Sequence, residues 1–391
     1  MKTILTVFLK EVRENLRDRR TVINTLLTGP LMAPFIFVLL INTMVARELD
    51  KAEKPLPIPV QGAEHAPSLI EALKQLGAEI KDAPADPEAA VREQEVDMVL
   101  RIPPSYAEAW RKGEQAQVEL IFDPSQRDSN GPVARASAML QGYSQRTGGM
   151  RMMARGLSPQ VTQPLVVARR DQSTPQSRGG TMFAILPYFF VLGAFIGGMA
   201  LAIDTTAGER ERQSLEPLFA NPVPRWRLLA GKLAATCAFS ATTVLLSIIA
   251  FAIAGGFLPT EKLGMTLDIG LRFTVYALLA MLPLVLLLAA LQTLVAAFAK
   301  SYREAQTYLS LLMIVPAIPS ILISILPVKA AMWMYATPIV GQSLIILRLL
   351  RGDVVSVQAL LACMAGTALA AALACWITAR VYRSEGLAIS G

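Results

Sequence analysis

Six long apolar runs dominate this sequence, and each is long enough to cross a lipid bilayer as a helix. In helical conformation, about 20 residues without a charge span the roughly 30 Å hydrocarbon layer. Of the 391 residues, 53% are hydrophobic and only 17% are charged, which is typical of membrane proteins. The sequence therefore predicts an all-α polytopic membrane protein. Its six transmembrane helices are expected at 21–46, 179–203, 233–260, 273–299, 305–328 and 354–379.

A seventh apolar stretch, residues 330–347, is shorter and is interrupted by Pro338 and Gly341. We interpret it as re-entrant helices at about 329–350 that dip into the membrane from its outer face. The alternative is a seventh span. It would move the C-terminal Arg380 and Arg383 to the outside, against the rule that basic loops stay in the cytoplasm.

The basic residues of the short loops predict the orientation of the six spans. With a cytoplasmic N-terminus, the inner segments hold 15 lysines and arginines and the short outer segments hold five. Both termini are therefore expected in the cytoplasm, and the protein in the cell inner (plasma) membrane. The same excess accounts for the net charge of +7 without nucleic acid as a partner. The inner segments are 1–20, 204–232, 300–304 and 380–391, and the outer ones are 261–272 and 329–353.

Residues 47–178 form the one large hydrophilic block, which is predicted to fold as an inserted extracytoplasmic α/β domain. The block holds 17 basic and 18 acidic residues, a balance typical of a folded domain. Its hydrophobic periodicity switches between that of strands and that of helices. The predicted strands are 55–60, 96–102 and 116–122, and the predicted helices are 68–77, 104–112 and 130–153.

Residues 1–20 are predicted to form a cytoplasmic amphipathic helix that leads into the first span as an uncleaved anchor. Apolar side chains recur at helical spacing, and charged side chains lie on the opposite side. Such a helix lies among lipid headgroups, whereas the alternative is an ordinary basic segment before a span. The apolar stripe comprises Leu5, Phe8, Leu9, Val12 and Leu16.

The sequence holds no recognisable catalytic or metal-binding constellation. Its one histidine, His65, falls in a loop, and its three cysteines fall inside predicted spans, so no metal-ligand spacing is present. Gly231-Lys232 resembles the end of a phosphate-binding loop, but Trp226 stands where that motif needs glycine. These features count against an intramembrane enzyme and against a nucleotide site on this chain.

Charged residues are concentrated between the second and third spans, in TTAGERERQSLEPLFANPVPRWRLLAGK at 205–232. Thr206 and Glu209 have capping-box spacing, which predicts a helix that starts at Ala207. This segment is either a lever that transmits a push to the spans or an interfacial helix that is merely solvated. Its apolar stripe comprises Leu215, Leu218 and Phe219.

The segment resembles the cytoplasmic coupling element of type-2 ATP-binding-cassette (ABC) exporter permeases. In that family an acidic helix precedes a Leu-Glu pair, a leucine, a proline and a Gly-Lys pair at the next span. The chain departs from the pattern at Gln213-Ser214, where the family often has Gly-Thr. The six spans and the inserted domain also fit, most closely in the branch that includes the sodium-extrusion permeases. The matching residues are Glu209, Glu211, Leu215-Glu216, Leu218, Pro222 and Gly231-Lys232.

The resemblance implies an assembly of two permease chains with two separate ABC ATPase subunits. ATP and Mg²⁺ would bind to the ATPases, and no cofactor is expected on this chain. The glutamates of the segment would pair with basic residues of a groove on the ATPase, and its apolar stripe would fill that groove. The second permease would be another copy of this chain or a close paralogue. The implied coupling residues are Glu209, Glu211, Leu215, Glu216, Leu218, Phe219 and Pro222.

Polar side chains inside or beside the spans are the candidates for a transport path. Each also fits an interhelical hydrogen bond, which is the commoner role. Because no ionisable residue lies inside the six runs, an intramembrane carboxylate relay for protons or cations is not expected. Two substrates stay open: a sodium ion held by hydroxyl, amide and carbonyl oxygens, and an amphipathic organic molecule exported through the dimer interface. The alternative function is a receptor or assembly factor whose outer domain binds a ligand without transport. The candidates are Asn24, Asn42, Gln292, Thr293, Gln306 and Tyr308.

The predicted orientation determines which positions a membrane-impermeant thiol reagent reaches in intact cells. A cysteine introduced within 60–120 is expected to react, and Arg212→Cys and Arg383→Cys are expected to be protected. External labelling of Arg383→Cys would mean that 330–347 spans the membrane and that the six-span topology is wrong.

Overall fold

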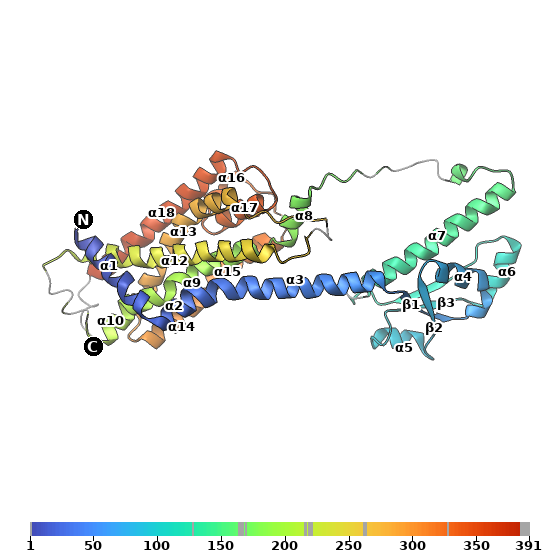
Figure 1. Cartoon of the computed structure of the whole chain (residues 1–391), viewed down its shortest axis with the longest axis horizontal. Helices are drawn as coiled ribbons and strands as arrows, with labels where there is room; N and C mark the ends of the chain where they lie inside the picture. The colour runs from blue at the N-terminus through green and yellow to red at the C-terminus, as the bar shows by residue number, and fades with distance from the viewer. Residues whose placement is uncertain are drawn as a thin grey trace. The chain divides into compact units, whose positions relative to one another are not determined.

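The structure, a computed structural model, describes residues 2–126, 129–162, 168, 170–214, 217, 222–260, 264–326 and 328–383. The chain divides into two compact units, and Figure 1 shows both of them. The membrane unit comprises residues 1–43 and 172–391, and the α/β unit comprises residues 44–171.

Six helical segments of the described residues are long and apolar enough to cross a membrane, as the apolar runs predicted. Some of them contain more than one helix, because a π-helical turn or a bend interrupts the regular geometry. The segments are Ile23–Arg47, Leu186–Glu211, Arg225–Gly255, Leu271–Phe298, Tyr302–Ile325 and Val357–Arg383. Their main helices are α3 (Gly29–Glu53), α9 (Leu186–Ile203), α12 (Arg225–Gly255), α13 (Leu271–Phe298), α14 (Tyr302–Leu312), α15 (Ile314–Ile325) and α18 (Val357–Arg383).

Two short helices, α16 (Met332–Ala336) and α17 (Val340–Leu350), occupy the seventh apolar stretch. At 1.5 Å per residue α17 is about 17 Å long, roughly half the hydrocarbon thickness, so it cannot span a bilayer. Its side chains are nevertheless largely buried. Gln342 donates to the carbonyl oxygen of Ala280 on α13 at 3.3 Å and to the hydroxyl of Thr367 on α18 at 2.8 Å. Helix α17 is therefore a core element of the membrane unit.

Helix α9 lies in the core of the membrane unit, where it contacts α12, α13, α15 and α17. It is apolar on every side, and 11 of its 18 residues are buried. Glycines allow α12 to approach it closely. A Cβ added at Gly197 would lie 2.7 Å from Oγ1 of Thr243 and 2.9 Å from Cα of Ser240. Small residues of this kind let membrane helices pack backbone against backbone.

Helix α1 (Lys2–Arg17) is amphipathic and is followed by α2 (Arg19–Val22). Two of the predicted stripe residues, Phe8 and Val12, pack against a small cluster on α9 and α12. Leu5, Leu9 and Leu16 are 52–57% exposed on the outer side of the helix. The helix is thus held against the membrane unit by one side, and contact of its exposed leucines with lipid stays a prediction.

The α/β unit is built on a four-stranded sheet with the order β2-β1-β3-β4. Strand β1 (Leu56–Gln61) pairs in parallel with β2 (Ala78–Asp82) and β3 (Met98–Arg101), and β4 (Glu119–Phe122) pairs antiparallel with β3. Parallel neighbours require crossover connections, in which helices occur here. The helices are α4 (Pro67–Gln75), α5 (Pro87–Arg92), α6 (Ser105–Lys112) and α7 (Asn130–Ala154), with short 3₁₀ turns at Ala63–His65 and Pro159–Thr162.

The predicted fold class, a helical membrane protein with an additional α/β domain, is confirmed, but two elements of that domain were missed. Strand β2 has the sequence AEIKD, in which only Ala78 is buried, so it lacks the alternation of a half-buried strand. The following helix, α5, has only six residues. The predicted end of the domain at residue 178 is also too late. Helix α8 (Pro175–Met182) contacts α17, and the N–H of Thr266 donates to the carbonyl oxygen of Pro175 at 3.0 Å.

The close packing of α9 on α12 predicts that Gly197→Ala lowers the melting temperature of the purified protein. The added methyl group would collide with the backbone of Ser240, and overpacking of a dense core costs about 1–3 kcal/mol. Gly193→Ala on the same helix is the matched control, because its Cβ would meet the Ser247 hydroxyl at 3.2 Å, the end of a side chain that can rotate. If both variants melt like the wild type, stability does not depend on this approach.

Candidate functional site

The charged segment after α9 continues that helix instead of starting a new one. A π-helical turn, Asp204–Gly208, joins α9 directly to α10 (Glu209–Glu211). Thr206 is buried within this stretch, and its hydroxyl donates to the carbonyl oxygen of Ala202 one turn earlier. The predicted capping box and helix start are therefore wrong, because Thr206 lies inside a helix where there is no N-terminus to cap. Helix α10 ends at Glu211, and Gln213, two residues later, has a left-handed φ of 56°.

Charged side chains from three helices meet at this end of α9. We call Lys10, Glu11, Glu209 and Lys232 the junction cluster. The ammonium group of Lys232 donates to the carboxylate of Glu209 and, at 2.7 Å, to the carbonyl oxygen of Thr205. Their side chains are only 2% and 9% exposed, respectively. A buried lysine needs an opposite charge, and here α10 supplies it to α12.

Helix α1 adds the other two members of the junction cluster. Nζ of Lys10 lies 3.8 Å from Oε1 of Glu209 and donates to Oε1 of Glu11 at 3.1 Å. Glu11 is 2% exposed, and this burial raises the pKa of its carboxyl group although the nearby Lys232 and Lys10 oppose the shift. The cluster therefore holds two acids and two lysines, and these charges compensate one another across α1, α10 and α12.

In the Gly231-Lys232 pair, the glycine allows close helix packing and the lysine forms an ion pair. A Cβ added at Gly231 would lie 2.7 Å from Cβ of Val7 and 3.0 Å from the carbonyl oxygen of Ile4, so only glycine allows α1 to lie this close. Lys232 follows directly and pairs with Glu209. The third span, predicted to start at residue 233, begins earlier than expected, because α12 starts at Arg225 and Lys232 lies in its second turn.

The predicted coupling residues are not all on a free surface. Glu209, expected to meet an ATPase, already has its partner inside the chain. Glu211 is exposed, and its Oε2 accepts from the backbone N–H of Tyr302 at 2.7 Å. Pro222 is exposed in a bend. The remaining four, Leu215, Glu216, Leu218 and Phe219, lie outside the described residues.

A line of buried hydroxyl groups continues along α12 from the junction cluster. Thr236, Ser240, Thr243 and Ser247 are spaced by three or four residues and share one face of the helix, towards the glycines of α9. Ser240 Oγ and Gln292 Oε1 have no hydrogen-bond partner among the described residues. A Cβ added at Gly198 would lie 2.6 and 2.9 Å from these two oxygens, so both lie beside Gly198.

The hydroxyl line was missed because single serines and threonines are common inside apolar runs. In the sequence it could have been recognised from four serine and threonine residues that follow Lys232 at intervals of three or four. The two oxygens without a partner could not be recognised without the facing helices.

The predicted path residues do not come together in one place. Gln292 and Thr293 are buried in α13, where Nε2 of Gln292 donates to the carbonyl oxygen of Phe195 at 2.7 Å. Gln306 and Tyr308 are exposed on α14, and the Tyr308 hydroxyl donates to Glu304 at 2.6 Å. Asn24 is exposed, and Asn42 donates to the carbonyl oxygen of Phe257 at 3.4 Å. Of these residues, Gln292 lies beside the hydroxyl line.

Comparison with known proteins identifies a family that this chain matches and a relative of similar length. A family model described as "ABC-2 family transporter protein" matches residues 21–377 of this chain. The relative is described as "ABC transporter permease protein NatB" of Bacillus subtilis (strain 168). It is 26% identical over 318 residues, which cover 80% of each chain.

Lys232→Met is expected to destabilise the protein, because Glu209 would stay buried without its main counter-charge. Breaking a buried ion pair by removing one partner costs about 3–5 kcal/mol, which should appear as a lower melting temperature and less folded protein in the membrane. The double variant Lys232→Met with Glu209→Gln should recover part of the loss, since no unpaired charge remains.

Lys300→Met, a change of the same type at an exposed position outside the cluster, is the control and should leave the melting temperature unchanged. A Lys232→Met protein that melts like this control would show that the ion pair is not needed for stability.

Proposed function

Because this chain belongs to the ABC-2 family of transporter proteins, we propose that it is the permease half of an ATP-driven exporter. It is a multi-pass membrane subunit of an ABC transporter, and such a permease works with a separate ATPase subunit. In the proposed assembly two permease chains, identical or closely related, bind two ATPases that carry ATP and Mg²⁺.

One observation carries this proposal above the others: the family match extends from residue 21 to residue 377. The matched range includes the first five candidate spans, the sixth up to residue 377, and the whole α/β unit. A receptor or assembly factor would need the α/β unit for ligand binding but would have no need of this whole arrangement of spans. Transport is therefore the better-supported function.

The proposed coupling element is the segment around 207–219, on the cytoplasmic side of the inner (plasma) membrane. Its start is helical and continuous with α9, and the junction cluster joins it to α1 and α12. A push on this segment would reach three helices at once. In this proposal Glu209 transmits the push inside the permease, while Glu211, Glu216 and the apolar stripe contact the ATPase.

The proposed substrate is a sodium ion or an amphipathic organic molecule. The observation that favours sodium as the first substrate to test is the hydroxyl line with its two unpartnered oxygens, Ser240 Oγ and Gln292 Oε1. Hydroxyl and amide oxygens are ligands of hard cations. Transport would be measured as ATP-dependent ²²Na⁺ uptake into proteoliposomes that contain the permease and its ATPase with the cytoplasmic side outwards.

Leu215→Asp with Leu218→Asp tests the coupling element. A carboxylate forced into an apolar groove costs several kcal/mol, so the ATPase should dissociate instead. The double variant is expected to insert into the membrane normally, yet to lose the co-purifying ATPase and all ATP-dependent transport.

The matched control is Met153→Asp with Leu157→Asp in the α/β unit, where these two side chains are 59% and 52% exposed. It should keep both the ATPase and transport. If the Leu215/Leu218 variant also keeps them, the segment is a solvated loop and the coupling proposal fails. If no ATPase co-purifies with the wild-type permease in mild detergent, the exporter proposal fails.

A further inference from the structure

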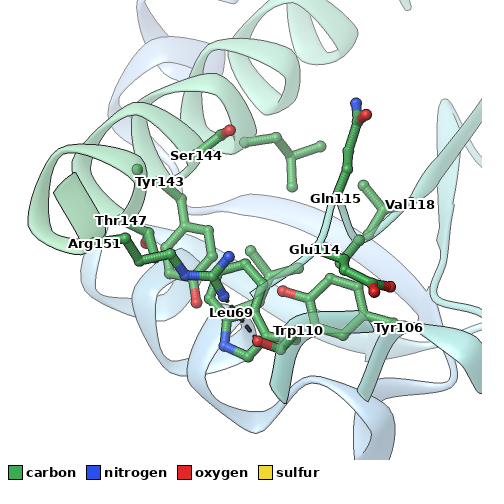
Figure 2. A pocket seen from close by; sticks show the side chains of 13 residues that line it. Leu69, Tyr106, Trp110, Glu114, Gln115, Val118, Tyr143, Ser144, Thr147 and Arg151 are labelled. Carbon is green, nitrogen blue, oxygen red and sulfur yellow. Dashed lines mark hydrogen bonds between the residues drawn. The ribbon is translucent and has the colours of Figure 1, made fainter. Parts of the chain in front are cut away.

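The α/β unit contains a cavity of about 250 Å³ between α6, α7 and the loop that leads to β4 (Figure 2). This volume is slightly below the range of about 300–1,000 Å³ that is typical of pockets for drug-sized ligands, so the ligand should be smaller, such as a compound with one fused ring system. Leu69, Val118 and Leu140 supply apolar wall, while hydroxyl and charged side chains supply polar groups. A few polar groups in a mostly apolar concave surface are typical of a ligand site.

A stack of aromatic rings forms part of the cavity. The Trp110 ring lies between 5 and 6 Å from two tyrosine rings: its centroid is 5.5 Å from that of Tyr106, at 14°, and 5.6 Å from that of Tyr143, at 13°. Tyr106 is 4% exposed, and burial raises its pKa to about 12, so this phenol stays neutral at physiological pH. The three rings give this side of the cavity an uncharged aromatic wall against which a planar ligand can pack.

Arg151 places a fixed positive charge beside this stack. Its guanidinium carbon lies 4.2 Å from the centroid of the Trp110 ring, and Nη2 donates to the Trp110 carbonyl oxygen at 2.9 Å. These two contacts fix the side chain but use few of its five N–H donors. No carboxylate lies within ion-pair distance of Arg151 in the part of the chain that the structure describes. Glu114 also lines the cavity, but it is exposed, on the loop after α6.

Two hydroxyl groups lie on the same side of α7 as Arg151. Ser144, Thr147 and Arg151 are spaced by three and four residues, which places them on one face of a helix, and Figure 2 shows their side chains along the same edge of the cavity. A carboxylate at this edge could therefore accept from the guanidinium and from a hydroxyl.

We propose that this cavity binds a small organic anion with a planar apolar body. The carboxylate of the ligand pairs with Arg151, because a planar guanidinium group can donate two parallel hydrogen bonds to two carboxylate oxygens. The ring of the ligand packs against the aromatic stack and against Leu69, Val118 and Leu140. An organic cation is the competing ligand class. It fits less well because Arg151 already covers the face of Trp110 that would attract it. The site does not depend on the transport proposal.

Isothermal titration of indole-3-propionate into the full-length protein tests this proposal, in an uncharged detergent with empty micelles as the blank. We expect saturable binding of one molecule per chain, weakened by salt because the contact is ionic. Tryptamine, with the same ring and a positive charge, should bind at least about tenfold more weakly. No saturable binding of indole-3-propionate, or tighter binding of tryptamine, would overturn the proposal.

Variants separate the charge from the cavity itself. Arg151→Met should weaken the binding of indole-3-propionate by about tenfold or more, because a charged hydrogen bond is lost. Arg146→Met, an exposed arginine of the same helix that does not line the cavity, should bind like the wild type. Ser144→Trp fills the cavity from an exposed position and should abolish binding without removing Arg151. Unchanged binding in Arg151→Met or in Ser144→Trp, with a normal melting temperature, would contradict the assigned site.

Discussion

A charge removed from water inside a helical bundle must find an opposite charge, and at the end of α9 this requirement determines how three helices meet. Lys232 is almost fully buried, so the helix that carries it has to lie where Glu209 can reach it. Glu209 in turn is placed by the unbroken passage of α9 through a π-helical turn. Helix α1 can join them only because Gly231 leaves room for Val7. Two adjacent residues of α12 thus hold the three helices together: Lys232 attracts Glu209, and Gly231 leaves the space for α1.

The same face of α12 changes character along its length. It begins with the buried ammonium group of Lys232 and continues with four hydroxyl side chains that lie against the glycines of α9. Hydroxyl groups inside helices usually donate to the carbonyl oxygen one turn earlier, as Thr236 and Ser247 do here. Ser240 does not, and its oxygen lies beside that of Gln292. Much of the buried polarity of the membrane unit is therefore collected between α9, α12 and α13.

Features that repeat along the chain could be predicted from the sequence, and features that depend on distant partners could not. The six spans and most strands follow from local periodicity, whereas AEIKD of β2 carries too weak a pattern to be recognised. The spacing of Thr206 and Glu209 is the same at a helix start and inside a helix, so the capping box was misassigned. The burial of Lys232 depends on its pair with Glu209, 23 residues away in the sequence. The cavity at Trp110 likewise requires α6 and α7 to meet.

The bond between Glu209 and Lys232 also limits how the membrane unit can move. It connects two helices that already pack closely at Gly193, Gly197 and Gly198, so α9 and α12 are held together both along a shared face and at one end. Two bodies joined in this way lose their independent degrees of freedom and travel as one. A change of shape within the membrane unit is then expected at the other boundaries of this pair of helices. The moving part of this protein would therefore be a rigid pair of helices, not a single one.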